Sequence, residues 1–439
     1  MKNSLFGTDG VRGIVGQDPF TPSALERLGR AIAQWAQKRV GAQSRVLVAS
    51  DTRASCPEVK EQLIRGLAHP GLTIIDTLVT PTPVAYWLVA NANDAQWGIV
   101  ISASHNPHRY NGIKIIAPGS TKLSALDEQE ISNLFHALPE KETCHTPEII
   151  QRTDGQALYL RMLDSFFPTH FLQGTTVSLD CAHGASSDLA PAAFRHFGAQ
   201  VNLYSASPNG LNINDKCGAV HPEELQKAVV HDKATFGFAF DGDGDRVVAV
   251  SCDGAVKDGD DILAILSRHP RYISEEAVVG TVVSNQGLSA YLAESNKKLL
   301  RANVGDKYVN ACMHENNLLL GGEPSGHIIV RDYLGTGDGV FTALRIAEAG
   351  IITNNPQLKS FTKYPLVSLN IPITTKKDLS LEPLASVIKE YESMLPQGRL
   401  VIRYSGTEPL LRLVVEDLDA EHAQALAQKL GKKLQELLL

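Results

Sequence analysis

FGFAFDGDGDRVVAV, residues 236–250, joins two apolar segments through a short loop of alternating acids and glycines. Two other stretches have the same plan of an apolar segment, a polar loop with reactive side chains and a second apolar segment. They are WGIVISASHNPHRYNGIKII at residues 97–116 and NLLLGGEPSGHIIV at residues 317–330. This weak internal repeat predicts three related units, each presenting one chemically active loop.

Helix and strand signals alternate around each copy of the repeat. Apolar residues recur at helical spacing in residues 21–41, with Thr21 as the expected N-cap, and residues 45–50 follow as a buried strand. Residues 175–204 and 277–304 each have the pattern of a strand, a helix and a strand before the next loop. We therefore predict an α/β protein with three related α/β domains, whose sheets are mixed but mainly parallel.

A smaller α+β unit is expected after these three. It contains the strand-like segments VSLNIPI, LVIRY and LLRLVVE, and it ends in a helix with a stripe of leucines at positions 426, 430, 434 and 438. Boundaries are expected at a polar, helix-like stretch near Gln151 and Arg152, at the turn Cys252–Gly254 and at the segment Thr362–Pro365. The predicted domains are residues 1–152, 153–253, 254–365 and 366–439.

The composition excludes several classes of protein. The 439 residues are 43% hydrophobic and 20% charged, and the formal net charge is −7, which argues against a nucleic-acid binder because that class needs a basic stripe. No apolar run approaches the roughly 18 residues of a membrane span, and the first 13 residues have no signal-peptide core, so we expect a cytoplasmic protein without a membrane partner. The six cysteines form no C-x-x-C pair, which predicts buried free thiols.

The strongest chemical signal is the loop DGDGDR at residues 241–246. Three carboxylates so close together repel one another unless a cation lies among them, and the glycines let the backbone fold tightly enough for them to converge. Hard oxygen ligands favour Mg²⁺ or Ca²⁺. An EF-hand is excluded because its sixth position should be glycine but is Arg246, and its twelfth should be glutamate but is Cys252. The predicted ligands are Asp241, Asp243 and Asp245, and a solvated acidic turn is the alternative.

The loop of the first repeat places Ser102 and Ser104 near His105, with Lys114 downstream. Taken alone, this stretch is equally consistent with a turn whose hydroxyls bond local backbone. A Ser-His-Asp hydrolase is disfavoured because the G-x-S-x-G elbow is absent here.

The loop of the third repeat offers a carboxylate, a hydroxyl and an imidazole within five residues. Glu323 and Ser325 have the chemistry to bind vicinal sugar hydroxyls, and His327 can exchange a proton near neutral pH. The alternative is a capped turn with a surface histidine.

The fourth unit contains RYSGTEP at residues 403–409, followed by Arg412. Two guanidiniums, two hydroxyls and a glycine have the composition of an anion-binding site, and a phosphate ester is a suitable ligand. The alternative is a hairpin turn whose arginines pair with Glu408, Glu416 and Asp417.

Five motifs in this order resemble those of the α-D-phosphohexomutase superfamily. They are FGTDGVRG (6–13), ISASHNP (101–107), DGDGDR (241–246), GGEPSGH (321–327) and RYSGTEP (403–409). Within the superfamily, FGTDGVRG and GLNINDKCGAVHPEEL (210–225) make the chain similar to the bacterial phosphoglucosamine mutases. The resemblance runs from Phe6 to the final helix.

The resemblance implies four domains around a central cleft and an isomerase that interconverts glucosamine 6-phosphate and glucosamine 1-phosphate, feeding UDP-N-acetylglucosamine and peptidoglycan synthesis. Ser102 would be the phosphoserine, and with Asp241, Asp243 and Asp245 it would hold one Mg²⁺ per chain. Sugar hydroxyls would bind Glu323 and Ser325. The phosphate that is not reacting would bind Arg403, Ser405, Gly406, Thr407 and Arg412. The transfer site would be lined by Arg12, His105, Lys114, Arg246 and His327.

The implied cycle passes the phosphoryl group from the serine to the sugar. The product, glucosamine 1,6-bisphosphate, then reorients and returns its other phosphoryl group, which favours a cleft closed by a mobile fourth domain. The sequence leaves the general base open among His327, His105 and Lys114. The oligomeric state, a monomer or a homodimer, is also left open by the sequence. The alternative functions are a phosphomannomutase or phosphoglucomutase, and a non-catalytic phosphosugar-binding protein.

Overall fold

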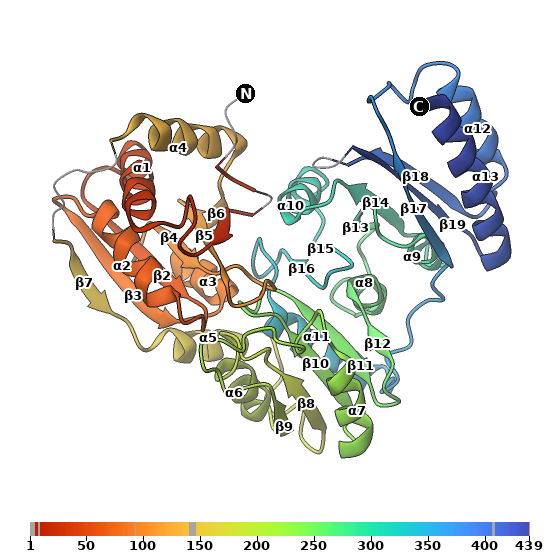
Figure 1. Ribbon diagram of the computed structural model, residues 1–439. Coiled ribbons are helices and arrows are strands. Elements are labelled where there is room, and N and C mark those ends of the chain that lie inside the picture. The colour runs from red at the N-terminus through yellow and green to blue at the C-terminus, as the bar shows by residue number, and fades with distance from the viewer. Residues whose placement is uncertain (1–4, 8, 93, 140–145, 406–408, 439) are drawn as a thin grey trace.

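Four β-sheets follow one another along the chain in this computed structural model, which describes residues 5–7, 9–92, 94–139, 146–405 and 409–438. Helices and parallel strands alternate in the first three sheets, and the fourth sheet is antiparallel, so the predicted α/β class is confirmed. The four units lie around an arc, with the first (red to orange) and the fourth (blue) at its ends (Figure 1). Among the described helices, none is long and apolar enough to cross a bilayer.

The first unit contains a seven-stranded sheet whose path runs β1-β5-β4-β2-β3-β7, with β6 paired to β5. Its central strand β2 alternates between two cores: Val46 and Val48 pack with α1, α2 and α4, while Leu47 packs toward α3. The elements of this unit are β1 (Val11–Ile14), α1 (Pro22–Val40), β2 (Ser44–Ser50), α2 (Cys56–Leu67), β3 (Leu72–Val79), α3 (Thr82–Asn91), β4 (Trp97–Ile101), β5 (Tyr110–Ala117), β6 (Thr121–Lys122), α4 (Ala125–Ala137) and β7 (Glu148–Gln151).

The ends of the first unit test two local predictions. Thr21 caps α1 as expected, because its hydroxyl accepts a hydrogen bond from the Ala24 N–H at 3.3 Å. The helix-like stretch predicted near Gln151 is wrong: residues 148–151 form β7, which pairs parallel with β3 at the sheet edge. Pairing with the neighbouring strand overrides the local helical pattern there.

The second and third units repeat a simpler plan, in which parallel strands are followed by one antiparallel hairpin. β12 lies after the turn Cys252–Gly254, yet it pairs with β11 of the second sheet. The second unit contains α5 (Gly155–Leu163), β8 (Thr176–Asp180), α6 (Leu189–His196), β9 (Gln200–Tyr204), α7 (Glu223–Asp232), β10 (Phe236–Phe240), β11 (Val247–Ser251) and β12 (Val256–Lys257). The third contains α8 (Gly259–Ser267), β13 (Ala277–Thr281), α9 (Gln286–Ala293), β14 (Lys298–Ala302), α10 (Asp306–Glu315), β15 (Leu320–Gly322), β16 (Ile328–Val330) and α11 (Gly339–Ile352).

The fourth unit has a core of its own. One continuous apolar cluster, from Leu47 to Leu358, joins the first three units, whereas the cluster of the fourth unit contains residues after 366 alone. The leucine stripe of the last helix is buried in that cluster, as predicted. The elements are β17 (Leu366–Pro372), α12 (Leu384–Ser393), β18 (Arg399–Tyr404), β19 (Leu410–Glu416) and α13 (Ala420–Leu438). A separate core leaves this unit able to move as one body.

The cysteines follow the sequence prediction in part. Cys56, Cys181 and Cys217 are buried, Cys252 and Cys312 are half-buried, and all five are free thiols. Cys144 lies outside the described residues.

Candidate active site

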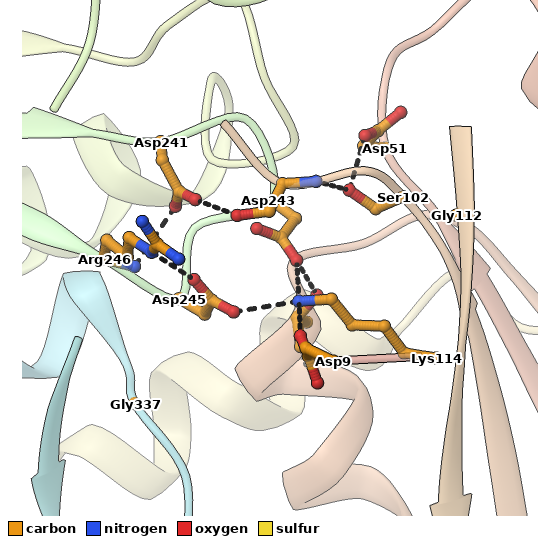
Figure 2. A network of polar contacts seen from close by, with 12 residues as sticks. Asp9, Asp51, Ser102, Gly112, Lys114, Asp241, Asp243, Asp245, Arg246 and Gly337 are labelled. Carbon is orange, nitrogen blue, oxygen red and sulfur yellow. Dashed lines mark hydrogen bonds and ion pairs between the residues drawn. The ribbon is translucent and has the colours of Figure 1, made fainter. Parts of the chain in front are cut away.

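The three repeats are three antiparallel hairpins, and their loops meet. In the first, β4 pairs with β5; in the second, β10 with β11; in the third, β15 with β16. The Ser104 hydroxyl of the first loop donates to Asp241 of the second at 2.6 Å, and the Val247 N–H donates to the Gly326 carbonyl of the third at 3.1 Å. The contacts between the first two loops lie at the centre of Figure 2. The repeat therefore marks the segments that build the site.

Two glycines make this close approach possible. Gly326 has a φ of +88°, and a Cβ at that position would lie 2.2 Å from the Val247 carbonyl oxygen. A Cβ at Gly242, in the second loop, would lie 2.7 Å from the Ser104 carbonyl oxygen of the first. Any larger residue at either position would push the loops apart.

Asp241, Asp243 and Asp245 converge as predicted. All three are buried, and one carboxylate oxygen of each lies within 4.8 Å of those of the other two. The Oδ1 atoms of Asp243 and Asp245 are buried without a hydrogen-bond partner. Burial and the charges of its two neighbours raise the pKa of Asp241 well above its usual value. Buried, mutually repelling carboxylates with oxygens that accept no hydrogen bond fit a hard divalent cation.

Lys114 supplies one positive charge to the cluster. Its ammonium donates to Asp243 at 2.8 Å and to Asp245 at 2.9 Å, and it lies 3.0 Å from Asp9 (Figure 2). Burial disfavours the charged amine, but the aspartates outweigh burial and hold the pKa of Lys114 well above its usual value. Lys114 therefore neutralises part of the negative charge of the aspartates.

The two serines of the first loop have different surroundings. The Ser102 hydroxyl is fully buried and donates to Asp51 at 2.6 Å (Figure 2). It also accepts the Ser104 N–H at 2.9 Å. The Ser104 hydroxyl contacts Asp241 and lies 3.4 Å from His105 Nδ1. The structure thus places Ser104, and not Ser102, at the aspartates, because Ser102 is turned toward Asp51.

A cavity of about 200 Å³ opens beside these loops. His105, Asp241, Arg246 and Ser325 all line it, so residues of all three loops share one space. The backbone N–H of Arg246 donates to Asp241 at 3.1 Å, and the Arg246 guanidinium lies 3.8 Å from Asp245. Burial, followed by the positive charges of Arg246 and Arg12, lowers the pKa of His105 to about 4. This histidine is therefore neutral at physiological pH.

Four family models match the chain in order. They describe the alpha/beta/alpha domains I, II and III of phosphoglucomutase/phosphomannomutase at residues 3–142, 158–254 and 258–363, and its C-terminal domain at residues 369–433. The phosphoglucosamine mutase of Pseudomonas syringae pv. tomato is 41% identical over 446 residues, 98% of either chain. That of Acinetobacter baylyi is 39% identical over 440 residues, 98% of this chain and 99% of its own. The chain belongs to the phosphoglucosamine mutase family.

Membership of this family makes the chain a mutase, an isomerase of the phosphohexomutase superfamily. Solved structures share its fold. A phosphoglucomutase/phosphomannomutase family protein from Burkholderia thailandensis superposes with a TM-score of 0.81 at 22% identity, over 98% of this chain and 97% of that one. The N-acetylphosphoglucosamine mutase of Aspergillus fumigatus, solved with GlcNAc-6P and magnesium, gives 0.69 at 15% identity, over 99% and 96%.

In the third loop of the mutase, Glu323 and His327 each accept a hydrogen bond from a backbone N–H of the protein itself. One Glu323 oxygen accepts the Gly305 N–H at 2.9 Å. His327 is buried, its Nε2 accepts the Gly337 N–H at 2.9 Å, and its Nδ1 lies 3.7 Å from Asp245. Because Nε2 is an acceptor, the proton of the neutral ring is on Nδ1, facing the aspartate. Glu323 does not line the cavity that contains Ser325.

The fourth unit of the mutase forms a second cavity. Arg403 and Arg412 face each other across β18 and β19, and they line a space of about 330 Å³ with Asn370 and Val282. Ser405 is buried, and its carbonyl accepts the Lys376 ammonium at 3.0 Å. Gly406 and Thr407 lie outside the described residues. The described residues that line this cavity share no member with those around Asp241, so the two sites are separate in this structure.

Several residues at the site were missed by sequence reasoning. Asp51 and Arg53 follow an apolar parallel strand, a position where sheet edges gather functional side chains, and that signal could have identified them. Thr82 donates to Asp243 at 2.5 Å from the start of α3. Asn214 contacts the first loop from 110 residues away, which no local pattern indicates. Arg12, which was predicted, lies 3.7 Å from Asp9.

Proposed function

We propose that this mutase interconverts glucosamine 6-phosphate and glucosamine 1-phosphate through a phosphoseryl enzyme and glucosamine 1,6-bisphosphate. Identities of 39–41% to phosphoglucosamine mutases over the full chain support this substrate. The observation that carries the mechanism is the Ser104 hydroxyl, which lies 2.6 Å from a carboxylate of the buried aspartate cluster. A hydroxyl in that place can hold a phosphoryl group where cationic side chains and a divalent ion neutralise it.

Ser104 replaces Ser102 as the proposed carrier. A phosphoryl group, with about two negative charges, would meet a carboxylate at either serine, because each hydroxyl donates to an aspartate at 2.6 Å. Asp241 belongs to the cluster that can hold a cation, whereas Asp51 is already paired with Arg53. Both serines are buried. The Ser104 hydroxyl, however, contacts Asp241 and lies beside His105, and both of these residues line the cavity, whereas the Ser102 hydroxyl is turned toward Asp51.

The metal of the proposed site is one Mg²⁺ per chain. Asp241, Asp243 and Asp245 would hold it together with an oxygen of the phosphoserine, because carboxylate oxygens are hard ligands and two of these accept no hydrogen bond. When bound, the ion supplies positive charge that polarises the phosphoryl group.

The side chains of the chain itself position and neutralise the reacting group. Lys114 and Arg246 contact the aspartates and would stabilise the charge of the transferring phosphoryl group, with Arg12 nearby. Lys114 is held charged by carboxylates and His327 is engaged by Gly337, so neither is a free base in this arrangement. His105 lines the cavity and is neutral, so it is the one of the three candidates placed to accept a proton, although its lowered pKa makes it a weak base.

The remaining predicted residues would bind the rest of the sugar phosphate. Ser325 lines the first cavity, where it can reach a sugar hydroxyl, and Glu323 retains one carboxylate oxygen for that role. The distal phosphate would bind in the fourth unit, at Arg403, Ser405, Gly406, Thr407 and Arg412. Because the two cavities are separate here, the fourth unit must move toward the Asp241 loop during the reaction.

The test compares two single variants of the full-length enzyme. We expect Ser104→Ala to lose both turnover of glucosamine 6-phosphate and the phosphate seen by intact mass before and after phosphatase treatment. Ser102→Ala is expected to keep a phosphatase-sensitive phosphate on Ser104. Retained turnover of Ser104→Ala, with phosphate mapped to Ser102, would show that the proposed carrier is the wrong serine.

Substrate preference is tested on the parent enzyme. Conversion of glucosamine 6-phosphate should exceed that of glucose 6-phosphate and mannose 6-phosphate. Equal rates on all three would favour the alternative, a phosphomannomutase or phosphoglucomutase.

A further inference from the structure

Two side chains outside the five motifs that carry the superfamily resemblance hold the loop that contains Ser104. Arg53 follows β2 in the first unit, and Asn214 lies between β9 and α7 in the second. We propose that both are positioning residues, which together set the backbone of Ser104 for phosphoryl transfer. This inference rests on the proposed function of Ser104.

Arg53 is buried, and all five of its N–H donors are used. Nε donates to Asp51 at 2.9 Å, and the other four hydrogen bonds go to carbonyl oxygens of the first loop. These oxygens belong to Ser104 at 2.9 Å, Asn106 at 2.8 Å, Pro107 at 2.6 Å and Tyr110 at 3.0 Å. A planar fork with five fixed donors matches this ring of acceptors, and a lysine does not.

Asn214 binds two of the same carbonyl oxygens from the other side. Its Nδ2 donates to the Ser104 oxygen at 2.9 Å and to the Asn106 oxygen at 3.2 Å. Its own backbone N–H donates to Ala182 at 2.9 Å, which fixes it to the second unit. We call Arg53 and Asn214 together the clamp. A Cβ at Gly242, inside the acidic loop, would lie 2.7 Å from both Asn214 Nδ2 and the Ser104 oxygen, so the clamp packs directly on that loop. The clamp therefore ties the first unit to the acidic loop.

The clamp has a clear consequence for Ser104. This residue has a φ of +53°, a left-handed conformation that a residue with a Cβ adopts at an energetic cost. Its N–H is bound by Ser102 at 2.9 Å and its carbonyl by both Arg53 and Asn214. With both backbone groups held, the side chain is directed to Asp241. A misplacement of about 1 Å at a reacting atom reduces rates by about 100-fold.

The principal test is Asn214→Asp, which preserves shape and tolerates the left-handed backbone (φ +58°) but turns a donor into an acceptor facing two carbonyl oxygens. The matched control is Asn212→Asp, two residues away, whose amide bonds Ser207 and Asn209 within its own loop. We expect Asn214→Asp to lower kcat by about 10- to 100-fold, with KM for the sugar phosphate changed by less than about twofold. Rapid-quench phosphorylation of dephosphorylated enzyme by glucosamine 1,6-bisphosphate should slow by the same factor. Asn212→Asp should retain the parental values.

Further variants keep the inference falsifiable if Asn214→Asp does not fold. Asn214→Gly removes the donor without straining the backbone, and Arg53→Lys keeps the charge but loses the fork; both should lower kcat and spare KM. A purely structural role would lower the melting temperature while kcat per folded enzyme stayed parental, and that result would overturn the clamp. If Ser104→Ala keeps its turnover, the proposed carrier fails. If Ser104→Ala is inactive while the clamp variants phosphorylate at the parental rate, the clamp alone fails.

Discussion

Lys114→Met should make the stability of the enzyme depend on a divalent cation. The ammonium lies 2.8–3.0 Å from three carboxylates and is almost fully buried. Methionine has a similar length and is apolar, so the substitution removes the charge with little loss of packing. The remaining carboxylates then repel one another in a buried place. A bound cation or a proton would relieve that repulsion.

The size of the effect follows from the burial of the cluster. Removing one partner of a buried ion pair lowers the free energy of unfolding by about 3–5 kcal/mol. Asp241, whose pKa is already raised, can take up a proton, so we expect a loss near the lower end, about 3 kcal/mol, without metal. A cation at 100 times its Kd returns about 2.7 kcal/mol to the folded state. Loss of the competing ammonium also strengthens cation binding, so magnesium should stabilise the variant more than the parent.

The assay is denaturation of both proteins in EDTA and in excess MgCl₂, comparing the first unfolding transition. Lys60→Met is the matched control, because Lys60 forms a partly buried ion pair with Asp76 at 2.7 Å in the same unit. That control should lose stability equally in both buffers. The reasoning fails if Lys114→Met loses the same free energy in EDTA and in magnesium, or if magnesium restores Lys60→Met to the same extent.

Two other predictions concern charges away from the reacting group. Lys122 bonds Asp9 at 2.7 Å and also contacts Asp306 of the third unit, so Lys122→Met should lower the free energy of unfolding by about 3 kcal/mol while Lys122→Arg retains most of it; chemical denaturation would decide. Burial raises the pKa of Asp260 to about 7, so its stabilising contribution is present below about pH 4 and is lost as the pH rises to about 7. Over that window this group should lower the free energy of unfolding by at most about 4 kcal/mol, and Asp260→Asn should flatten the profile; identical slopes for parent and variant would contradict the assignment.

The sequence repeat predicted which segments build the site because it has a simple physical cause. Each copy is a buried hairpin, and a hairpin places its polar loop at the edge of its sheet. The loops therefore lie at the ends of three hairpins as expected, and Asp241, Asp243 and Asp245 converge in one of them. The hairpins are formed by residues 97–116, 236–250 and 317–330. The stretch near Gln151 failed because its strand is defined by pairing with β3, which local periodicity does not contain.

Local sequence pattern could not lead to Ser104, rather than Ser102, as the proposed phosphoryl carrier, for a different reason. Both serines lie in one short polar loop. Because a single residue separates them, an alternating inward and outward pattern of side chains assigns both to the same side. What distinguishes them is the left-handed backbone at Ser104 and the carboxylate of Asp51 that binds Ser102. The backbone of Ser104 is in turn held by Arg53 and Asn214, 51 and 110 residues away in the chain. Contacts of such long range can be identified only in the folded molecule.

The separate core of the fourth unit is relevant to how the proposed site could bind one sugar bisphosphate in two orientations. Arg403 and Arg412 line a cavity that shares no described residue with the one around Asp241. The unit is joined to the third by polar contacts: Arg399 donates to the carbonyls of Val282 and Ser284, and Glu416 accepts the Gln286 N–H at 2.7 Å. No apolar cluster of the described residues spans this junction. Polar contacts to one short loop permit rotation at lower cost than a shared core. In the proposed cycle the first three units would therefore keep the aspartates, Ser104, Arg53 and Asn214 in place while the fourth unit brought its arginines to the substrate.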